Sequence, residues 1–494
     1  MRGTTKLRSW VAAAAVLLAA CTAASQPLVH LPTGAGGVVS VSEPDIAGPL
    51  RLRGNDLVDA AGRVVIIHGV NSVQKSEPFL SPLEDGWLGP ADLASFDRDG
   101  FSGVRLGVRP ERLMPEPGVI DQVYLDDLEA VVDALSENNM WVLLDFHQDV
   151  FTGMPPWATL PAASALSDEA PEFLKPIGWA AAYFSPRSLQ QWEDWWSNAA
   201  LPGGRGVVDA FGDGLAAVAQ RFAGADNLIG IELLNEPFPS KSQLPSCLTG
   251  SCPALDALMS VRFAELTNRV RAVAPTMPVW WEPVTLSVLS PKPNLDISGV
   301  TAGPAGRQVG VSFHTYCLGT DAGEEVEPSP VELMLCNPAY QRSFDHAQGL
   351  ATRWDAPAMM TEFGASASPL NVTEPARLAD RYLMSWLHWH HPFGPSLEPP
   401  DVVASQLVRT YAQATAGQPL AQSFDPASGR FSFRFRPDPT IEAPTSIVVP
   451  GPQYPDGYVA TVVGGEVTSA PNAGHLTVVA DPGSTEVSVA VTRA

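Results

Sequence analysis

The sequence predicts an α/β protein in which a (β/α)8 barrel of the TIM type is followed by a small C-terminal β-sandwich. Three observations lead to this fold. From Leu52 onward, short apolar runs alternate with longer amphipathic stretches, a pattern typical of repeated β-α units with a parallel sheet. Polar residues follow almost every apolar run, where barrel enzymes place their active sites. After about Ala416, segments of alternating polarity separated by Pro, Gly and Asp turns replace this pattern.

The 494 residues exceed the length of a typical single domain, so one large unit with a smaller companion is expected. We predict a signal peptide of the lipoprotein type at residues 1–21, a Gly-, Pro- and Ser-rich linker at 22–50, the barrel at 51–415 and the sandwich at 416–494. The net charge of −23 argues against nucleic acid as a partner, because phosphates attract an excess of Lys and Arg. A neutral or zwitterionic substrate fits this charge better.

The first twenty residues have the pattern of an export signal, with basic residues at positions 2, 6 and 8 before an apolar stretch from Trp10 to Ala20. The tetrapeptide Leu18-Ala19-Ala20-Cys21 resembles the lipobox of bacterial lipoproteins, in which the cysteine is lipidated. Ordinary cleavage after Ala24 is the alternative. We therefore expect a protein that is secreted or anchored to the outer face of a bacterial cell membrane by lipid on Cys21.

The other four cysteines form two locally spaced pairs, and we predict the disulfides Cys247–Cys252 and Cys317–Cys336. Four cysteines allow three connectivities, so the local pairing is a choice among them. No His lies at a suitable offset from these cysteines, and we predict no metal site.

Eight apolar runs can form the barrel strands, and helix-like stretches with apolar residues near helical spacing lie between them. The expected strands are Val64–Ile67, Gly103–Leu106, Trp141–Leu144, Gly230–Leu234, Pro278–Trp281, Val309–Phe313, Ala358–Thr361 and Leu383–Leu387. The expected helices include Tyr124–Asn138, Val208–Phe222, Ala254–Val273 and Ala339–Trp354. Strands of the sandwich are expected at Arg430–Arg436, Ser446–Val449, Tyr458–Val463 and Val487–Val491.

Two glutamates stand at the ends of predicted strands, Glu236 within Asn235-Glu236-Pro237 and Glu362 within Thr361-Glu362-Phe363. Cleavage of a glycosidic bond needs one protonated carboxyl group, which gives its proton to the leaving oxygen, and one ionised carboxylate on the opposite side of the anomeric carbon. A separation of roughly 5 to 5.5 Å leads to covalent catalysis with retention of configuration. Two carboxylates at one barrel mouth therefore indicate a glycoside hydrolase.

Several of these motifs together carry a family resemblance. Arg105, Asn235-Glu236-Pro237, His314-Thr-Tyr316, Glu362-Phe-Gly364 and the late Trp389 resemble glycoside hydrolase family 5, a family of retaining barrel hydrolases. Within that family, Leu144–Phe151, Asn71–Lys75 and Ile441–Ile447 are similar to segments of bacterial endoglycoceramidases. The resemblance runs from about Leu52 to the C-terminus. It implies hydrolysis of the bond between oligosaccharide and ceramide in glycosphingolipids, through a covalent glycosyl-enzyme intermediate and without a cofactor.

The resemblance also implies a role for each matching residue. Glu236 is the general acid/base and Glu362 the nucleophile. Arg105 and Tyr316 donate hydrogen bonds that stabilise the charged form of Glu362, whereas Glu236 is expected to have a raised pKa in a less compensated environment. Asn235 binds the 2-hydroxyl of the sugar at the cleavage point. The remaining residues of the predicted substrate site are Lys75, His147, Asp149, His314 and Trp389, with the Trp389 ring stacked on the sugar face.

Some questions stay open at the level of sequence. His388 precedes Trp389 where the family usually has Tyr, and the Cys317–Cys336 pair follows Tyr316, so a preference for galactosylceramide-linked glycans is the nearest alternative. A β-glucanase or β-mannanase of the same clan, or a non-catalytic carbohydrate-binding lipoprotein, is a further alternative.

The long Trp-rich stretch from Pro155 to Trp196 either walls the cleft or simply covers the barrel. The spacing of Trp192, Trp195 and Trp196 also suits a helix docked on the core. We expect a monomer that meets its glycosphingolipid substrate by transient contact with a membrane or micelle surface.

Overall fold

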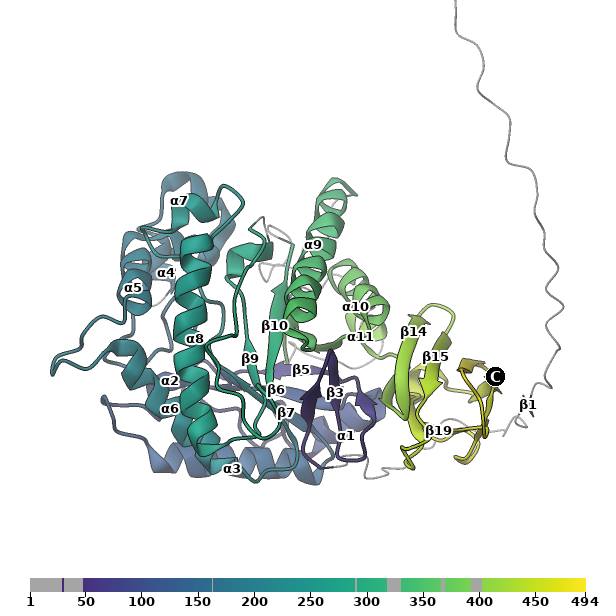
Figure 1. Ribbon diagram of the computed structural model, residues 1–494. Helices are drawn as coiled ribbons and strands as arrows, with labels where there is room; N and C mark the ends of the chain where they lie inside the picture. Colours follow the sequence, from purple (N-terminus) through teal and green to yellow (C-terminus); the bar gives the residue numbers. More distant parts are fainter. Residues whose placement is uncertain are drawn as a thin grey trace, which may run out of the picture.

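The computed structural model describes residues 29–30, 48–161, 163–288, 291–317, 330–365, 369–391 and 402–494 (Figure 1). The predicted signal peptide with Cys21 lies outside the described residues, as does most of the predicted linker. None of the helices in these ranges combines the length and the apolar character needed to cross a bilayer.

Eight parallel strands close into a barrel, which confirms the predicted fold. In order around the barrel they are β5 (His68–Ser72), β6 (Gly103–Val108), β7 (Trp141–Phe146), β8 (Leu228–Glu232), β9 (Val279–Trp281), β10 (Val309–Thr315), β11 (Ala358–Phe363) and β12 (Ser385–His388). The strands are buried almost throughout, as expected for a parallel sheet covered on both faces. Gly69 allows β5 to approach β6 closely, because a Cβ atom there would lie 1.9 Å from the Gly103 carbonyl oxygen.

The barrel is surrounded by α1 (Pro90–Asp99), α3 (Gln122–Glu137), α6 (Val207–Arg221), α8 (Pro253–Val273), α9 (Pro330–Trp354) and α10 (Leu370–Tyr382) (Figure 1). The four helices expected from apolar spacing are confirmed, although α9 begins earlier than predicted. In α3, for example, the Asp121 side chain caps the N-terminus by accepting a hydrogen bond from the Tyr124 amide, and Leu125, Leu128 and Leu135 are buried.

Shorter helices occupy the loops that follow the strands at the carboxyl end of the barrel. They are α2 (Pro110–Leu113) after β6, then α4 (Ala163–Ser167), η1 (Glu172–Phe184) and α5 (Pro186–Trp196) after β7, α7 (Leu244–Cys247) after β8 and η2 (Thr285–Val288) after β9. The helices α4 and α7 lie at the same end of the barrel as the start of α9 (Figure 1).

The prediction that Val64–Ile67 forms the first barrel strand is wrong. Val64 and Val65 form β4, which pairs with β13 (Tyr411–Thr415) in a different sheet, and the first barrel strand is β5, which begins at His68. The strand β5 has the sequence His-Gly-Val-Asn-Ser and so lacks an apolar run. Its His68 ring is nevertheless buried, stacked between Trp386 and Tyr411 at centroid distances of 4.3 and 3.6 Å. Within this apolar run, Val65 and Ile67 pack in one cluster with barrel residues such as Trp141, whereas Ile66 packs against Tyr411 of the sandwich. The strand β8 also begins and ends two residues earlier than predicted.

Two antiparallel sheets form the C-terminal sandwich. One sheet has the order β1-β17-β20-β15-β14 and the other the order β18-β19-β16-β13-β4-β3-β2. Their remaining strands are β1 (Val29–His30), β2 (Arg51–Arg53), β3 (Asp56–Val58), β14 (Gly417–Asp425), β15 (Arg430–Pro437), β16 (Thr445–Val448), β17 (Tyr458–Val463), β18 (Gly465–Val467), β19 (His475–Ala480) and β20 (Val487–Arg493), with α11 (Val402–Leu407) and η3 (Gly451–Gln453) nearby in the chain. The range 51–415 that we predicted for the barrel therefore includes four strands of the sandwich, β2, β3, β4 and β13.

The alternating pattern that predicted the sandwich strands is seen most clearly in β15. Phe431, Phe433 and Phe435 are buried in the core of the sandwich, whereas the residues between them are exposed. The sandwich is bonded to the barrel through Tyr411, whose hydroxyl lies 2.9 Å from Ser102 Oγ and donates to the Gly100 carbonyl. The two parts therefore share a buried, hydrogen-bonded contact.

Both predicted disulfides are present. Cys247 at the end of α7 is bonded to Cys252 just before α8, and Cys317 after β10 is bonded to Cys336 in α9. The second bond lies directly beside Tyr316 in the chain, so it ties the loop after β10 to α9.

Candidate active site

Glu236 and Glu362 come together at the carboxyl end of the barrel. Glu362 lies in β11 and Glu236 in the loop after β8, and both are largely buried. One carboxylate oxygen of each residue lies within 4.8 Å of the other. This short separation suits a retaining mechanism, since inverting enzymes hold their carboxyl groups about 6.5 to 9.5 Å apart.

Glu362 is held by the two donors expected from the sequence. Arg105 Nη1 donates to Glu362 Oε1 at 2.5 Å, and the Tyr316 hydroxyl donates to Oε2 at 2.8 Å. Hydrogen bonds from a guanidinium and a phenol favour the ionised carboxylate. Both carboxylate oxygens of Glu362 are thus held in place by hydrogen-bond donors.

Arg105 is the centre of a buried polar network and is itself fully buried. Apart from Glu362, its guanidinium contacts Glu232 Oε2 at 2.6 Å, Asn235 Oδ1 at 2.7 Å, Asn71 Oδ1 at 2.8 Å and Asp145 Oδ1 at 3.0 Å. The planar fork of five N–H donors matches this set of acceptors in a way that an ammonium group could not. Arg105 therefore fixes Glu362 relative to Asn235, the residue before Glu236.

Both carboxylate oxygens of Glu236 contact a donor. His314 Nδ1 lies 3.1 Å from Oε1, and the Tyr183 hydroxyl donates to Oε2 at 2.5 Å. Burial favours the neutral acid, but the hydrogen bond and the positive charge of His314, together with the Tyr183 hydrogen bond, outweigh it and lower the pKa of Glu236. The prediction of a raised pKa in the free enzyme is wrong, because the sequence did not show that these two donors converge on Glu236.

The backbone of Glu236 has an unusual conformation, with φ at 47° in the left-handed region. Two buried side chains hold it there. Glu282 Oε2 accepts a hydrogen bond from the Glu236 amide at 2.7 Å, and Gln148 Nε2 donates to the Asn235 carbonyl at 2.6 Å. A strained backbone conformation persists only where several surrounding contacts hold it, so Glu282 and Gln148 position the backbone at Glu236.

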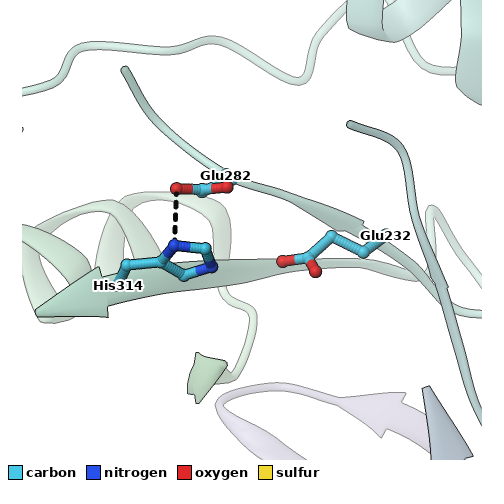
Figure 2. Close-up of side chains that lie close together, drawn as sticks. All are labelled: Glu232, Glu282 and His314. Atoms are coloured by element: carbon cyan, nitrogen blue, oxygen red, sulfur yellow. Dashed lines mark ion pairs between the residues drawn. The ribbon is translucent and has the colours of Figure 1, made fainter. Parts of the chain in front are cut away.

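His314 Nδ1 faces three carboxylates at once. Besides Glu236, it lies 3.5 Å from Glu282 Oε1 and 3.5 Å from Glu362 Oε2. Figure 2 shows the Glu282 contact, with Glu232 near the other side of the ring. Burial opposes a charge on the imidazole, but Glu282 and Glu362, together with the Glu236 hydrogen bond, raise the pKa of His314 to about 10. Burial and the charges of Glu232 and Glu236 in turn raise the pKa of Glu282 well above its usual range. His314 is therefore cationic at neutral pH and Glu282 is neutral.

Two groups of side chains in the described part of the chain have close metal-ligand atoms, Glu232/Glu282/His314 and Glu236/His314/Glu362. A metal ion fits neither group well. Arg105 already pairs with Glu232 and Glu362, and the cationic His314 occupies the position where a metal would bind. The hydrolytic chemistry needs only the carboxylates.

The raised pKa of His314 predicts how stability depends on pH. The folded protein binds this proton more tightly than the unfolded chain, whose histidines titrate near pH 6.5. The resulting stabilisation is complete below about pH 6.5 and is lost as the pH rises toward about 10. His314→Gln should therefore lose less thermal stability than the wild type between pH 7 and 10.

Thermal midpoints measured across this range test the prediction, with His475→Gln in the sandwich as the matched control. The control should follow the wild-type curve. Equal slopes for the wild type and His314→Gln would contradict a stabilising charge on His314.

The residues predicted to bind the sugar also lie together. Lys75 Nζ is 2.8 Å from Asp149 Oδ2 and 4.7 Å from the centre of the Trp389 ring. The His147 ring is stacked on Trp389 at 5.3 Å, and its Nδ1 lies 2.7 Å from Asp145 Oδ2. Asn235 Nδ2 donates to the Gln148 carbonyl, which fixes the amide beside Glu236. Charged, amide and aromatic groups are thus presented together, as recognition of sugar hydroxyls and of a sugar face requires.

Lys75 is partly exposed, and we predict that it contributes to binding of the sugar. Loss of a hydrogen bond from its charge to a sugar hydroxyl is expected to raise KM about tenfold in Lys75→Ala with little change in kcat. Steady-state kinetics on a soluble aryl β-lactoside, with the exposed Lys292→Ala as control, measure this. A fall in kcat at unchanged KM would place Lys75 in the chemical step instead.

His388, which we expected at the substrate side, is the last residue of β12. Its side chain is fully buried beneath Gly364, where an added Cβ would lie 2.2 Å from His388 Nε2.

The Trp-rich stretch has two parts with different roles. Trp192, Trp195 and Trp196 on α5 are fully buried and pack against aromatic rings such as Phe151 and Phe211, so they dock the helix on the core. The side chain of Trp179 lies outside the described residues. The preceding segment η1 brings Tyr183 to Glu236, a contact that sequence analysis missed.

Sequence analysis also missed Asp145, Gln148 and Glu232. Glu232 stands within a predicted strand and Asp145 directly after one, and a polar residue inside or next to an apolar run was the available signal.

Comparisons with known proteins agree with this geometry. The model of the cellulase family, glycosyl hydrolase family 5, matches residues 58–391, and the model of the glycoside hydrolase family 5 C-terminal domain matches residues 409–491. Endoglycoceramidase I of Rhodococcus hoagii (strain 103S) is 38% identical over 452 residues, which cover 90% of this chain and 88% of that protein.

Solved structures of endo-glycoceramidase II from Rhodococcus sp. are also similar. Its ganglioside GM3 complex superposes with a TM-score of 0.73 at 26% identity, covering 90% of this chain and 100% of the other. Its lactosyl-enzyme intermediate gives a TM-score of 0.69 at 25% identity, covering 88% and 99%. The matching family models span the barrel and the sandwich together, and the chain belongs to glycoside hydrolase family 5.

Proposed function

We propose that the protein is a retaining endo-glycosidase that hydrolyses the bond between oligosaccharide and ceramide in glycosphingolipids. The observation that carries the reaction type is the Glu236–Glu362 pair, with carboxylate oxygens within 4.8 Å in a buried site beside an aromatic and charged sugar-binding group. The substrate class is supported by 38% identity to Endoglycoceramidase I over nearly the whole chain.

In the first step, ionised Glu362 attacks the anomeric carbon while Glu236 protonates the leaving ceramide oxygen. In the free enzyme, Glu236 and His314 hold one proton between them, and it resides on the imidazole. Transfer across the 3.1 Å contact from Nδ1 to Oε1 makes Glu236 the neutral acid and leaves His314 neutral. The proton then passes to the glycosidic oxygen as that bond breaks.

In the second step, Glu236 acts as base for the water that hydrolyses the glycosyl-enzyme. Glu362 has lost its negative charge in the ester, so the repulsion that it exerted on Glu236 is absent. Tyr183 still donates to the carboxylate form of Glu236, and the proton that Glu236 takes from the water returns to His314 Nδ1 across the 3.1 Å contact. Attack of the activated water releases the intact glycan with its configuration retained.

Contact with a lipid surface is supported by an apolar rim around the mouth of the barrel. We define this rim by exposed residues in the loops after β5, β7 and β8 and in the start of α9, namely Leu83, Phe173, Leu248, Met334 and Leu335. Phe173 and Met334 are 79% and 75% exposed. Large apolar side chains exposed at one end of a protein suit an interface with a micelle or a membrane. The enzyme would reach its substrate there as a monomer, exported and anchored through Cys21.

The proposal is tested by incubating the purified protein with lactosylceramide micelles, a 6-linked galactosylceramide oligosaccharide and a soluble β-glucan. Released glycan and ceramide are measured by mass spectrometry. We expect intact lactose and ceramide from the first substrate. Faster cleavage of the second would assign the galactosylceramide preference, and cleavage of the glucan alone would overturn the substrate class.

A further inference from the structure

One residue of η1 (Glu172–Phe184), which we call the cover segment, contacts the acid/base Glu236. Tyr183 lies near the end of η1, 53 residues before Glu236 in the chain, and its hydroxyl donates to Glu236 Oε2 at 2.5 Å. Its side chain is buried, with the residue only 5% exposed. The phenol of Tyr183 therefore belongs to the active site and is not a surface group of the cover segment.

Aromatic packing fixes the position of this hydroxyl. The Tyr183 ring packs on Phe238 at a centroid distance of 4.8 Å, and Phe184 packs edge-on against the same ring at 5.3 Å. Phe238 follows Glu236 by two residues, and its carbonyl accepts a hydrogen bond from Trp196 Nε1 at 2.9 Å. The cover segment and the loop that carries the acid/base are therefore packed together as one unit.

We propose that Tyr183 is a positioning residue that orients the Glu236 carboxylate and sets its balance between acid and base. This inference rests on the proposed function of Glu236. With Oε1 held by His314 and Oε2 by Tyr183, the carboxylate cannot rotate without loss of a hydrogen bond. The cover segment thus contributes a positioning residue to the active site.

The chemistry of the phenol makes it a constant donor. Burial, and next the negative charge of Glu236, raise the pKa of Tyr183 well above its usual value near 10. The phenol keeps its proton throughout the working range of the enzyme, and as a donor it therefore stabilises the charged form of Glu236 more than the neutral form. That form is the base of the second step, so the contribution of Tyr183 is greatest in hydrolysis of the glycosyl-enzyme.

The test is the pH dependence of Tyr183→Phe on 2,4-dinitrophenyl β-lactoside. This leaving group needs no acid, so kcat reports hydrolysis of the glycosyl-enzyme and kcat/KM reports its formation. Loss of a hydrogen bond to a charged group should move the acidic limb of kcat upward by about one pH unit. The acidic limb of kcat/KM, which depends on Glu362, should stay in place.

Two further proteins complete the test. Replacement of Tyr183 by 3-fluorotyrosine keeps the ring and strengthens the donor, so the limb should move to lower pH. Tyr411→Phe removes a buried hydroxyl at the contact with the sandwich and should leave both limbs unchanged. A uniform loss of kcat at every pH in Tyr183→Phe, with no shift of the limb, would show a merely structural role and overturn the proposal.

The aryl substrate separates this inference from the choice of natural substrate. If the wild type cleaves the aryl lactoside but not lactosylceramide, the glycosphingolipid assignment fails while the Tyr183 test still stands. A wild type that is inactive on the aryl lactoside would overturn both.

Discussion

Glu362→Gln is expected to reduce kcat/KM on lactosylceramide by about 10⁴-fold or more, a loss typical of a removed nucleophile. The amide is nearly isosteric with the carboxylate, and its single oxygen can still accept a hydrogen bond from Arg105 while its NH2 group faces the Tyr316 hydroxyl, so the fold should be preserved. It cannot form the glycosyl ester. Stopped-flow kinetics with 2,4-dinitrophenyl β-lactoside should accordingly show no burst of released phenol.

Glu236→Gln provides the matched comparison, since it alters the other carboxylate. It should lose about 10² to 10⁴-fold on lactosylceramide, whose leaving group needs an acid, but should still release the activated phenol in a burst. Addition of azide, which needs no general base, should restore turnover of this variant and yield the β-glycosyl azide. Azide rescue of Glu362→Gln but not of Glu236→Gln would reverse the two assignments.

Arg105→Met should destabilise the barrel by about 3 to 5 kcal/mol, because it leaves Asp145, Glu232 and Glu362 as buried carboxylates without their cation. The activity should fall in addition, since Glu362 loses its strongest donor. Arg105→Lys restores a charge without the planar fork, and it should recover part of the stability and little of the activity.

Chemical denaturation of the three proteins, with activity assays on the same samples, measures both effects. Arg434→Met is the control, because Arg434 forms an exposed ion pair with Glu486 in the sandwich, where about 1 kcal/mol or less is expected. An Arg105→Met protein as stable as the control would show that the buried carboxylates are neutral without Arg105.

The main parts of the fold could be predicted from sequence because each depends on local patterns. The barrel strands β6, β7, β9, β10 and β11 are apolar runs, and β15 shows its buried face by strict alternation. The strand β5 could not be found in this way, because its role rests on His68 packing between Trp386 and Tyr411, both distant in sequence. The apolar residues Val64 and Val65 were predicted as the first barrel strand instead, although they pair with β13 in a sheet of the sandwich.

The active site, like the fold, could be predicted only where it depends on local sequence. The motifs containing Asn235, Glu236 and Glu362 are contiguous and lie at strand ends, so they could be recognised directly. The pKa of Glu236 could not be predicted, because it depends on His314 and Tyr183, which reach it from 78 residues after and 53 residues before it in the chain. Local sequence therefore identifies the reacting groups, whereas their protonation depends on tertiary contacts.

The most direct test of the central claim is the stereochemistry of the product. Proton NMR of the lactose released from lactosylceramide, recorded before mutarotation, distinguishes the two anomers. We expect β-lactose to appear first, because two displacements at the anomeric carbon retain its configuration. Initial release of α-lactose would contradict the covalent role of Glu362 and with it the proposed mechanism.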